Sequence, residues 1–219
     1  KAAAPAAAPA PAAAPAAPAP KPEVTVKIGH VAPLTGPQAH LGKDNENGAR
    51  MAIDELNAKG LEIGGAKIKL ELVPEDDQAD PKQGTIVAQK LVDAKVNGVV
   101  GHLNSGTTIP ASRIYNSAGI PMISPSSTNV TLTQQGFPYI FRTMANDAQQ
   151  GSVIGKYAAT KLGKKVAIID DRTAYGQGLA DATRYLHDAV DVPMDAVTFL
   201  PVIEHPEKIL CVGMNYADK

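Results

Sequence analysis

Two short stretches rich in hydroxyl side chains are the residues best suited to binding a small solute. Asn104-Ser105-Gly106-Thr107-Thr108 follows an apolar run at 98–101, and Ser124-Pro125-Ser126-Ser127-Thr128-Asn129 follows another at 120–123. Ligands of open parallel sheets bind beyond the carboxyl ends of the strands, and hydroxyls and amides at a helix N-terminus suit a carboxylate. The pattern therefore predicts a ligand site that contains Ser105, Thr107, Ser126, Ser127 and Thr128. An equally supported alternative is that these side chains only cap helices and shape turns.

A third candidate is Tyr175-Gly176-Gln177-Gly178, which follows the apolar run at 166–169. Gly-x-Gly at a strand-to-helix junction is typical of dinucleotide sites, but Asp181 stands where the third glycine would be. The match is therefore weak. We interpret the two glycines as residues of a tight turn.

Metal and catalytic sites have little support in the sequence. The histidines are scattered, without a pair at helical spacing and without nearby carboxylates at ligand spacing: His30, His40, His102, His187 and His205. The pairs Asp76-Asp77 and Asp170-Asp171 follow predicted strands, and we interpret them as exposed loop carboxylates. No nucleophile motif of the G-x-S-x-G type occurs. We expect no metal, no cofactor and no enzymatic activity.

Charge and composition exclude two classes of partner. The chain has 219 residues, 21 basic and 22 acidic, with a formal net charge of −1. It therefore lacks the basic excess that attracts nucleic acid or an anionic membrane. No apolar run approaches 18 residues, so we expect no membrane insertion. The single cysteine, Cys211, excludes an internal disulfide.

The elements that must position these loops alternate along the chain. Residues 1–23 are almost entirely Ala and Pro and predict an extended linker. Strand and helix patterns then alternate from Val24, which predicts right-handed crossovers and an α/β fold of three layers around a parallel sheet. Gly60 and Asp80-Pro81 mark a helix end and a helix start, respectively. Ile209-Leu210-Cys211-Val212 predicts a last strand.

Several longer runs carry a resemblance to a known family. They occur in this order: Pro33-Leu34-Thr35-Gly36-Pro37, Asn47-Gly48-Ala49-Arg50-Met51-Ala52-Ile53, Glu75-Asp76-Asp77-Gln78-Ala79-Asp80-Pro81, Gly98-Val99-Val100-Gly101-His102-Leu103, Phe141-Arg142-Thr143 and Tyr175-Gly176-Gln177-Gly178. On these runs the chain resembles the periplasmic branched-chain amino-acid-binding proteins of ABC transporters from residue 24 to about 182.

The resemblance implies a type I periplasmic-binding-protein fold, with residues 24–143 as a complete first lobe and 144–182 as part of a truncated second lobe. It implies that Ser105 and Thr128 hold the carboxylate of an amino acid and that a carbonyl near Ser126 or Ser127 meets the ammonium group. Tyr175 would cover the side-chain pocket. Leu41 stands where relatives place a large aromatic. It further implies a periplasmic location and an ABC transporter permease as partner.

The end of the chain resembles something else. Residues 183–219 read as a divergent tail, and residues from about 196 are similar to the start of a fumarylacetoacetate-hydrolase-family enzyme. In that family a histidine follows the Asn-Tyr-x-Asp turn, where this chain has Lys219. The alternative function is therefore a fragment of such an enzyme fused to a sensor or binding lobe.

Overall fold

The computed structural model describes residues 21–162, 167–184 and 209–212. The predicted linker, apart from its last three residues, and most of the predicted tail lie outside these ranges. Strands and helices alternate as expected. In chain order they are β1 (Glu23–Ala32), α1 (Ala39–Lys59), β2 (Leu61–Ile63), β3 (Ala66–Asp76), α2 (Pro81–Asp93), β4 (Gly98–Gly101), α3 (Ser105–Ser117), β5 (Met122–Ser124), α4 (Thr131–Gln134), β6 (Ile140–Arg142), α5 (Asp147–Tyr157), a π-helical turn (Ala158–Leu162), β7 (Ala167–Asp170), α6 (Ala174–Arg184) and β8 (Ile209–Val212).

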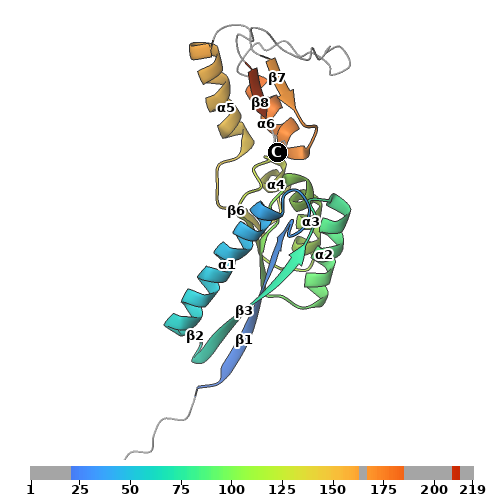
Figure 1. Ribbon diagram of the computed structural model, residues 1–219. Helices are drawn as coiled ribbons and strands as arrows, with labels where there is room; N and C mark the ends of the chain where they lie inside the picture. The colour runs from blue at the N-terminus through green and yellow to red at the C-terminus, as the bar shows by residue number, and fades with distance from the viewer. Residues whose placement is uncertain (1–20, 163–166, 185–208, 213–219) are drawn as a thin grey trace, which may run out of the picture.

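The larger sheet has six strands in the order β2-β3-β1-β4-β5-β6. All its pairs are parallel except the β2–β3 hairpin. The chain moves outward from β1 to β3 and then back past β1 to β4. Right-handed crossovers therefore place α1 on one face of the sheet and α2 and α3 on the other (Figure 1). The predicted α/β three-layer fold is confirmed.

Two separate groups of buried apolar side chains hold the described elements together. The larger group lies between the six-stranded sheet and α2, α3 and α4, and includes Leu91, Tyr115 and Met122, all 0% exposed. The smaller one is built by α6, with Leu179 and Ala180 packed against side chains of α5 and β7. Burial of such side chains contributes about 1.5–3 kcal/mol each and is the main force that holds the layers in place.

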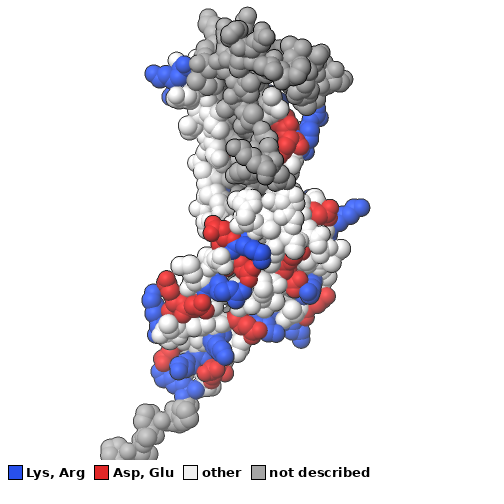
Figure 2. Space-filling view, in the orientation of Figure 1, with Lys and Arg blue, Asp and Glu red and all other residues white. Residues whose placement is uncertain are grey.

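A second, two-stranded parallel sheet is formed by β7 and β8 (Figure 1). The strand predicted at 209–212 is therefore present, and it pairs with the strand that precedes α6. On the face of the molecule in Figure 2, basic and acidic side chains are interspersed without an extended patch of one sign. Among the described residues, no helix combines the length and apolar character needed to cross a bilayer.

Three helix ends are stabilised by contacts between residues close together in the chain. Asp80 accepts a hydrogen bond from the backbone N–H of Gln83, with Pro81 in the first turn of α2. Asn146 and Gln149 form a capping box at the start of α5. Gly60 ends α1 in the left-handed region at φ 75°. The contacts at Gly60 and Asp80 confirm the predicted end of α1 and the predicted start of α2.

One interpretation of the glycines is wrong. Gly176 and Gly178 lie inside α6, which begins at Ala174, so they do not form a tight turn. A Cβ atom on Gly176 would lie 2.2 Å from Oδ1 of Asp171, and one on Gly178 would lie 2.7 Å from Nδ2 of Asn129. A side chain at either position would require Asp171 or Asn129 to move, because α6 packs closely on both.

Candidate functional site

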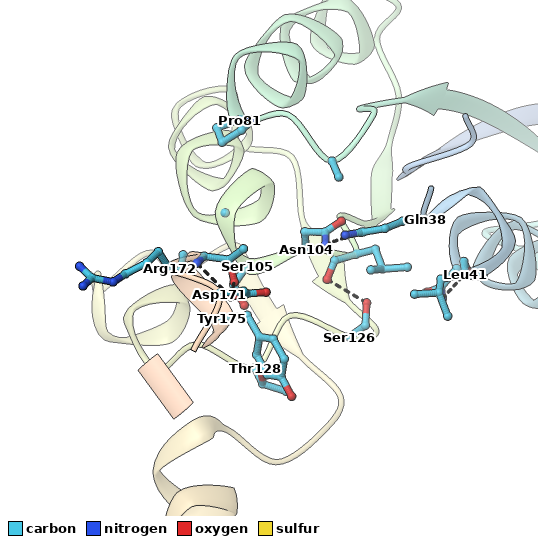
Figure 3. Close-up of a pocket in the computed structure, with 16 residues that line it drawn as sticks. Gln38, Leu41, Pro81, Asn104, Ser105, Ser126, Thr128, Asp171, Arg172 and Tyr175 are labelled. Atoms are coloured by element: carbon cyan, nitrogen blue, oxygen red, sulfur yellow. Dashed lines mark hydrogen bonds between the residues drawn. The ribbon is translucent and has the colours of Figure 1, made fainter. Parts of the chain in front are cut away.

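A cavity of about 940 Å³ lies where the carboxyl ends of the parallel strands meet α6 (Figure 3). One wall is made by the two hydroxyl-rich loops, a second by the beginning of α1, and a third by residues 171–175. The lining residues are Gln38, Leu41, Asn45, Ala79, Pro81, Leu103, Asn104, Ser105, Gly106, Ser126, Thr128, Asp171, Arg172, Thr173, Ala174 and Tyr175. The position agrees with the general rule for ligand sites in open parallel sheets.

The N-terminus of α3 is left open toward this cavity. Asn104 occupies the N-cap position, but its side chain makes no capping hydrogen bond. Its amide group instead donates to Oε1 of Gln38 at 2.8 Å (Figure 3). The first N–H groups of a helix have no intrahelical acceptors and carry a partial positive charge. Ser105 and Gly106, the first residues of α3, both line the cavity and can therefore donate to an anion.

The hydroxyl of Ser105 joins the two loops. It is 2% exposed, and its Oγ accepts from the backbone N–H of Asn129 and from Oγ of Ser127, each at 3.3 Å. A serine hydroxyl has two acceptor lone pairs and one hydrogen to donate. Since both acceptor positions are used, the hydrogen of Ser105 remains available to a ligand oxygen.

Three successive carbonyls of the second loop are already engaged. Arg142 donates from Nη1 to the carbonyl of Asn129 at 2.8 Å and to that of Ser127 at 3.4 Å. The backbone N–H of Asp147 donates to the carbonyl of Thr128 at 2.9 Å. Ser126 lines the cavity, and its own hydroxyl is turned away to donate to the carbonyl of Leu103.

The structure separates the residues predicted for the site into two groups. Ser105, Ser126, Thr128 and Tyr175 line the cavity, whereas Thr107 and Ser127 do not. Thr107 is fully buried against Gly84 of α2, and its hydroxyl donates to the carbonyl of Asn104.

Ser127 lies behind Ser105. Its N–H donates to the hydroxyl of Ser124, which itself donates to the carbonyl of His102. The two loops therefore contain both side chains that line the cavity and side chains that bond only within the protein.

Residues on α6 and before it close the third wall. Asp171 accepts from both the N–H and the hydroxyl of Thr173 at 3.0 and 2.7 Å, which fixes the chain where it enters α6. Tyr175 lies one residue into the helix and faces the second loop (Figure 3). Asn129 donates from Nδ2 to the carbonyl of Ala174 at 2.7 Å, which links the second loop to α6.

Two features of the site have no counterpart in the residue predictions. Gln38, at the N-cap of α1, and Asn45, one helical turn beyond Leu41, contribute carboxamides to the wall. Gln38, Leu41 and Asn45 stand at positions i, i+3 and i+7, and this one-face spacing could have revealed them.

The second feature is a buried network behind the wall. Asp77 is 0% exposed, so its interpretation as an exposed loop carboxylate is wrong. Its Oδ2 lies 2.9 Å from Nδ1 of His102, and Nε2 of that ring lies 3.0 Å from the hydroxyl of Tyr115. Burial, followed by the charges of Asp77 and Glu75, raises the pKa of Tyr115. Asp77 also accepts from the N–H of Ala79, and both Ala79 and Leu103, the residue after His102, line the cavity.

In the part of the chain that the structure describes, no group of three or more His, Cys, Asp or Glu side chains could hold a metal ion. The polar groups that line the cavity are hydroxyls, amides and carbonyls, together with the carboxylate of Asp171 and the guanidinium of Arg172.

The sheet order and the cavity beyond the carboxyl ends of the parallel strands define the class of fold, an α/β fold of three layers with a candidate site for a small solute. The chain belongs to the periplasmic binding protein family, which matches residues 25–201. This match continues beyond residue 182, where the resemblance is expected to fade, and it covers residues 196–201 of the stretch compared with hydrolases. The comparisons give the hydrolase alternative no support.

Individual relatives agree with this assignment. The chain is 49% identical over 161 residues to an amino acid binding protein of Pseudomonas aeruginosa. It is 48% identical over 160 residues to the Leu/Ile/Val-binding protein homolog 2 of Brucella abortus. Each alignment covers 73% of this chain and 42% of the relative, so the chain spans less than half the length of these relatives.

A solved structure shows the same fold. It is the branched-chain amino acid transporter substrate binding protein LivJ of Streptococcus pneumoniae in complex with isoleucine, with a TM-score of 0.68 and 36% identity. The similarity covers 76% of this chain and 47% of that one. The predicted resemblance to branched-chain amino-acid-binding proteins is confirmed.

Proposed function

We propose that this chain binds an aliphatic, branched-chain amino acid as the solute-binding component of an ABC importer. The observation that carries the proposal is the uncapped N-terminus of α3, which faces a cavity together with the free hydroxyl hydrogen of Ser105. A ligand carboxylate there would receive hydrogen bonds from Ser105 and from the first amides of the helix. The relatives named for Leu, Ile and Val binding support the choice of ligand.

The ammonium group of such a ligand needs acceptors, and the second loop offers one. The resemblance leaves the choice between the carbonyls of Ser126 and Ser127 open. The carbonyl of Ser127 is occupied by Arg142, and Ser127 does not line the cavity, whereas Ser126 does. These contacts favour the carbonyl of Ser126.

The remaining candidates have different roles in this proposal. Leu41 and Tyr175 would border the ligand side chain. Thr107 and Ser127 would hold the loops in shape from behind. Residues 24–143 form the first lobe in this scheme, 144–182 begin the second, and 1–23 act as a tether. The periplasmic location, the permease partner and the absence of enzymatic activity follow from the proposed role in the family.

Calorimetric titration with leucine, isoleucine and valine tests the proposal. Ser105→Ala should weaken binding by about 1–3 kcal/mol, because the carboxylate loses a hydrogen bond from a buried donor. Ser117→Ala, an exposed serine at the other end of the same helix, is the matched control and should leave binding unchanged. Absence of heat and of a thermal shift with all three amino acids at millimolar concentration would refute the proposal.

A further inference from the structure

Asn104 is a helix-capping residue that does not cap its helix. It occupies the N-cap position of α3 with an extended backbone, at φ −81° and ψ 139°, yet its side chain accepts no hydrogen bond from the first turn. The atom that would accept it, Oδ1, is buried and has no hydrogen-bond partner among the described residues. Asparagine is one of the best N-cap residues, so an unused acceptor at this position requires an explanation.

Two other helices show what the side chain of Asn104 could do. Asp80 and Asn146 also stand at N-cap positions with extended backbones. Their side chains accept from the backbone N–H three residues further on, that of Gln83 and that of Gln149, respectively. The backbone of Asn104 therefore permits a cap, and only the direction of its side chain differs.

Gln38 holds the side chain of Asn104 away from α3. Nδ2 of Asn104 donates to Oε1 of Gln38 at 2.8 Å, and this bond joins two residues of the cavity wall that are 66 positions apart in the chain (Figure 3). Gln38 is itself the N-cap residue of α1 and makes no capping hydrogen bond there. The starts of α1 and α3 are thus tied to each other, and neither is closed by its own side chain.

The backbone of Asn104 is fixed independently of its side chain. Its carbonyl accepts from the N–H groups of Thr107 and Thr108 at 3.2 and 2.9 Å and from their hydroxyls at 3.1 and 2.7 Å. A rotation of the side chain alone would therefore bring Oδ1 over the first turn of α3.

A capping oxygen and a ligand carboxylate would compete for the same place. An N-cap side chain accepts from the second or third residue of its helix, which in α3 are Gly106 and Thr107. The partial positive charge that favours an anion is concentrated at these first N–H groups. A capped α3 would therefore present an oxygen of Asn104 to the cavity where the proposed ligand places its carboxylate.

We propose that Gln38 is a positioning residue that keeps Asn104 from capping α3 and so leaves the N-terminal amides of this helix available to the ligand carboxylate. The role rests on the proposed function, because it assumes that a carboxylate binds at these amides. Loss of the bond between Gln38 and Asn104 should weaken ligand binding without removing any donor to the carboxylate.

Calorimetric titration of the full chain with L-leucine compares the unmodified protein with three variants. Gln38→Leu removes the acceptor for Asn104, so the affinity should fall by about fivefold, because an N-cap contributes about 1 kcal/mol. Asn104→Ala removes the competing side chain and should keep the affinity within about twofold. The double variant should have the affinity of Asn104→Ala, because nothing is left to cap the helix. This recovery distinguishes competition by Asn104 from a loss of packing at Gln38.

Amide hydrogen exchange of the ligand-free protein gives a second readout. A cap would protect the N–H of Gly106 or of Thr107, so the exchange of one of these hydrogens should slow in Gln38→Leu and return to its original rate in the double variant. Gln134→Leu is the matched control, since Gln134 is exposed at the end of α4 and does not line the cavity. It should change neither the affinity nor the exchange rates.

Two calorimetric results would overturn the role of Gln38. One is an affinity of Gln38→Leu equal to that of the unmodified protein. The other is an affinity of the double variant as low as that of Gln38→Leu, which would show that Asn104 is not the competitor. Gln38→Ala takes the place of Gln38→Leu if that variant does not fold.

The ligand-free measurement separates this inference from the proposed function. Absence of leucine binding to the unmodified protein would refute the proposed function, while slowed exchange in Gln38→Leu would still show that Gln38 holds Asn104 away from α3. Leucine binding that is equally strong in the unmodified protein and in Gln38→Leu, with unaltered exchange, would leave the proposed function standing and refute this inference.

Discussion

Tyr115→Phe removes a single oxygen atom from the network behind the ligand wall. The hydroxyl of Tyr115 lies 3.0 Å from Nε2 of His102, whose Nδ1 lies 2.9 Å from Asp77. Because a carboxylate only accepts, Nδ1 of His102 carries a hydrogen, and in that tautomer Nε2 accepts from the hydroxyl of Tyr115. All three side chains are 0% exposed, so water cannot replace the lost hydroxyl.

The expected cost follows from the atom left behind. Phenylalanine keeps the ring of Tyr115 and its packing in the core, so the space left by the missing oxygen adds little to the free-energy cost. Nε2 of His102 becomes a buried acceptor without a partner, which costs about 1–3 kcal/mol of unfolding free energy. Asp77 also accepts from the N–H of Ala79 at 3.1 Å, so part of the effect should reach the ligand wall.

Urea unfolding followed by circular dichroism measures this cost. The midpoint should fall while the slope stays unchanged, because the variant exposes the same surface on unfolding. Tyr139→Phe is the matched control, since Tyr139 is 42% exposed and its loss of a hydroxyl should change stability by less than about 0.5 kcal/mol. Equal urea midpoints for the two variants would show that the hydrogen bond between Tyr115 and His102 does not stabilise the protein.

Three further predictions concern packing and protonation. Gly178→Ala should cost about 1–3 kcal/mol of unfolding free energy, because its Cβ would lie 2.7 Å from Nδ2 of Asn129. Gly48→Ala is the control: this glycine lies in open space on α1, so alanine there should stabilise the protein by about 0.5–1 kcal/mol. The urea midpoints of the two variants measure the difference. Asp147 has a raised pKa, so the native state holds its proton to higher pH than the unfolded chain, and its ionisation reduces stability as pH rises through that window. Asp147→Asn should therefore raise the melting temperature at pH 7, with the difference shrinking as pH falls to about 4; a difference independent of pH would contradict this. Burial lowers the pKa of His30, so its contribution to stability is complete above about pH 6.5 and is lost at lower pH. His30→Gln should therefore reduce the fall in urea midpoint between pH 7.5 and 5.5. A fall as large as in the unmodified protein would exclude His30 as its source.

The fold was largely predictable from the sequence because its signals are local and repeated. Buried parallel strands are short apolar runs, and Asp80-Pro81 and the Asn146–Gln149 capping box mark helix starts within four residues. The hairpin strand β2 was not predicted. It has only three residues, and it lies between Gly60, which signals a helix end, and the turn glycines Gly64 and Gly65.

The site was predictable as a region and less so as a set of side chains. Ser105 and Thr107 belong to the same hydroxyl-rich stretch, yet only Ser105 lines the cavity because the first turn of α3 directs the other toward α2. The start of α6 and the burial of Asp77 depend on contacts between elements far apart in the chain. Composition and periodicity carry no information on such contacts.

The central claim is that the open N-terminus of α3 receives the carboxylate of an amino acid. Amide NMR spectra of the ¹⁵N-labelled chain, recorded during a titration with L-leucine, test it most directly. The signals of Ser105 and Gly106 should shift and saturate with the affinity measured by calorimetry, while the amide of Ser117 at the other end of the helix stays in place. Saturable binding of leucine that leaves the Ser105 and Gly106 signals unmoved would contradict the account.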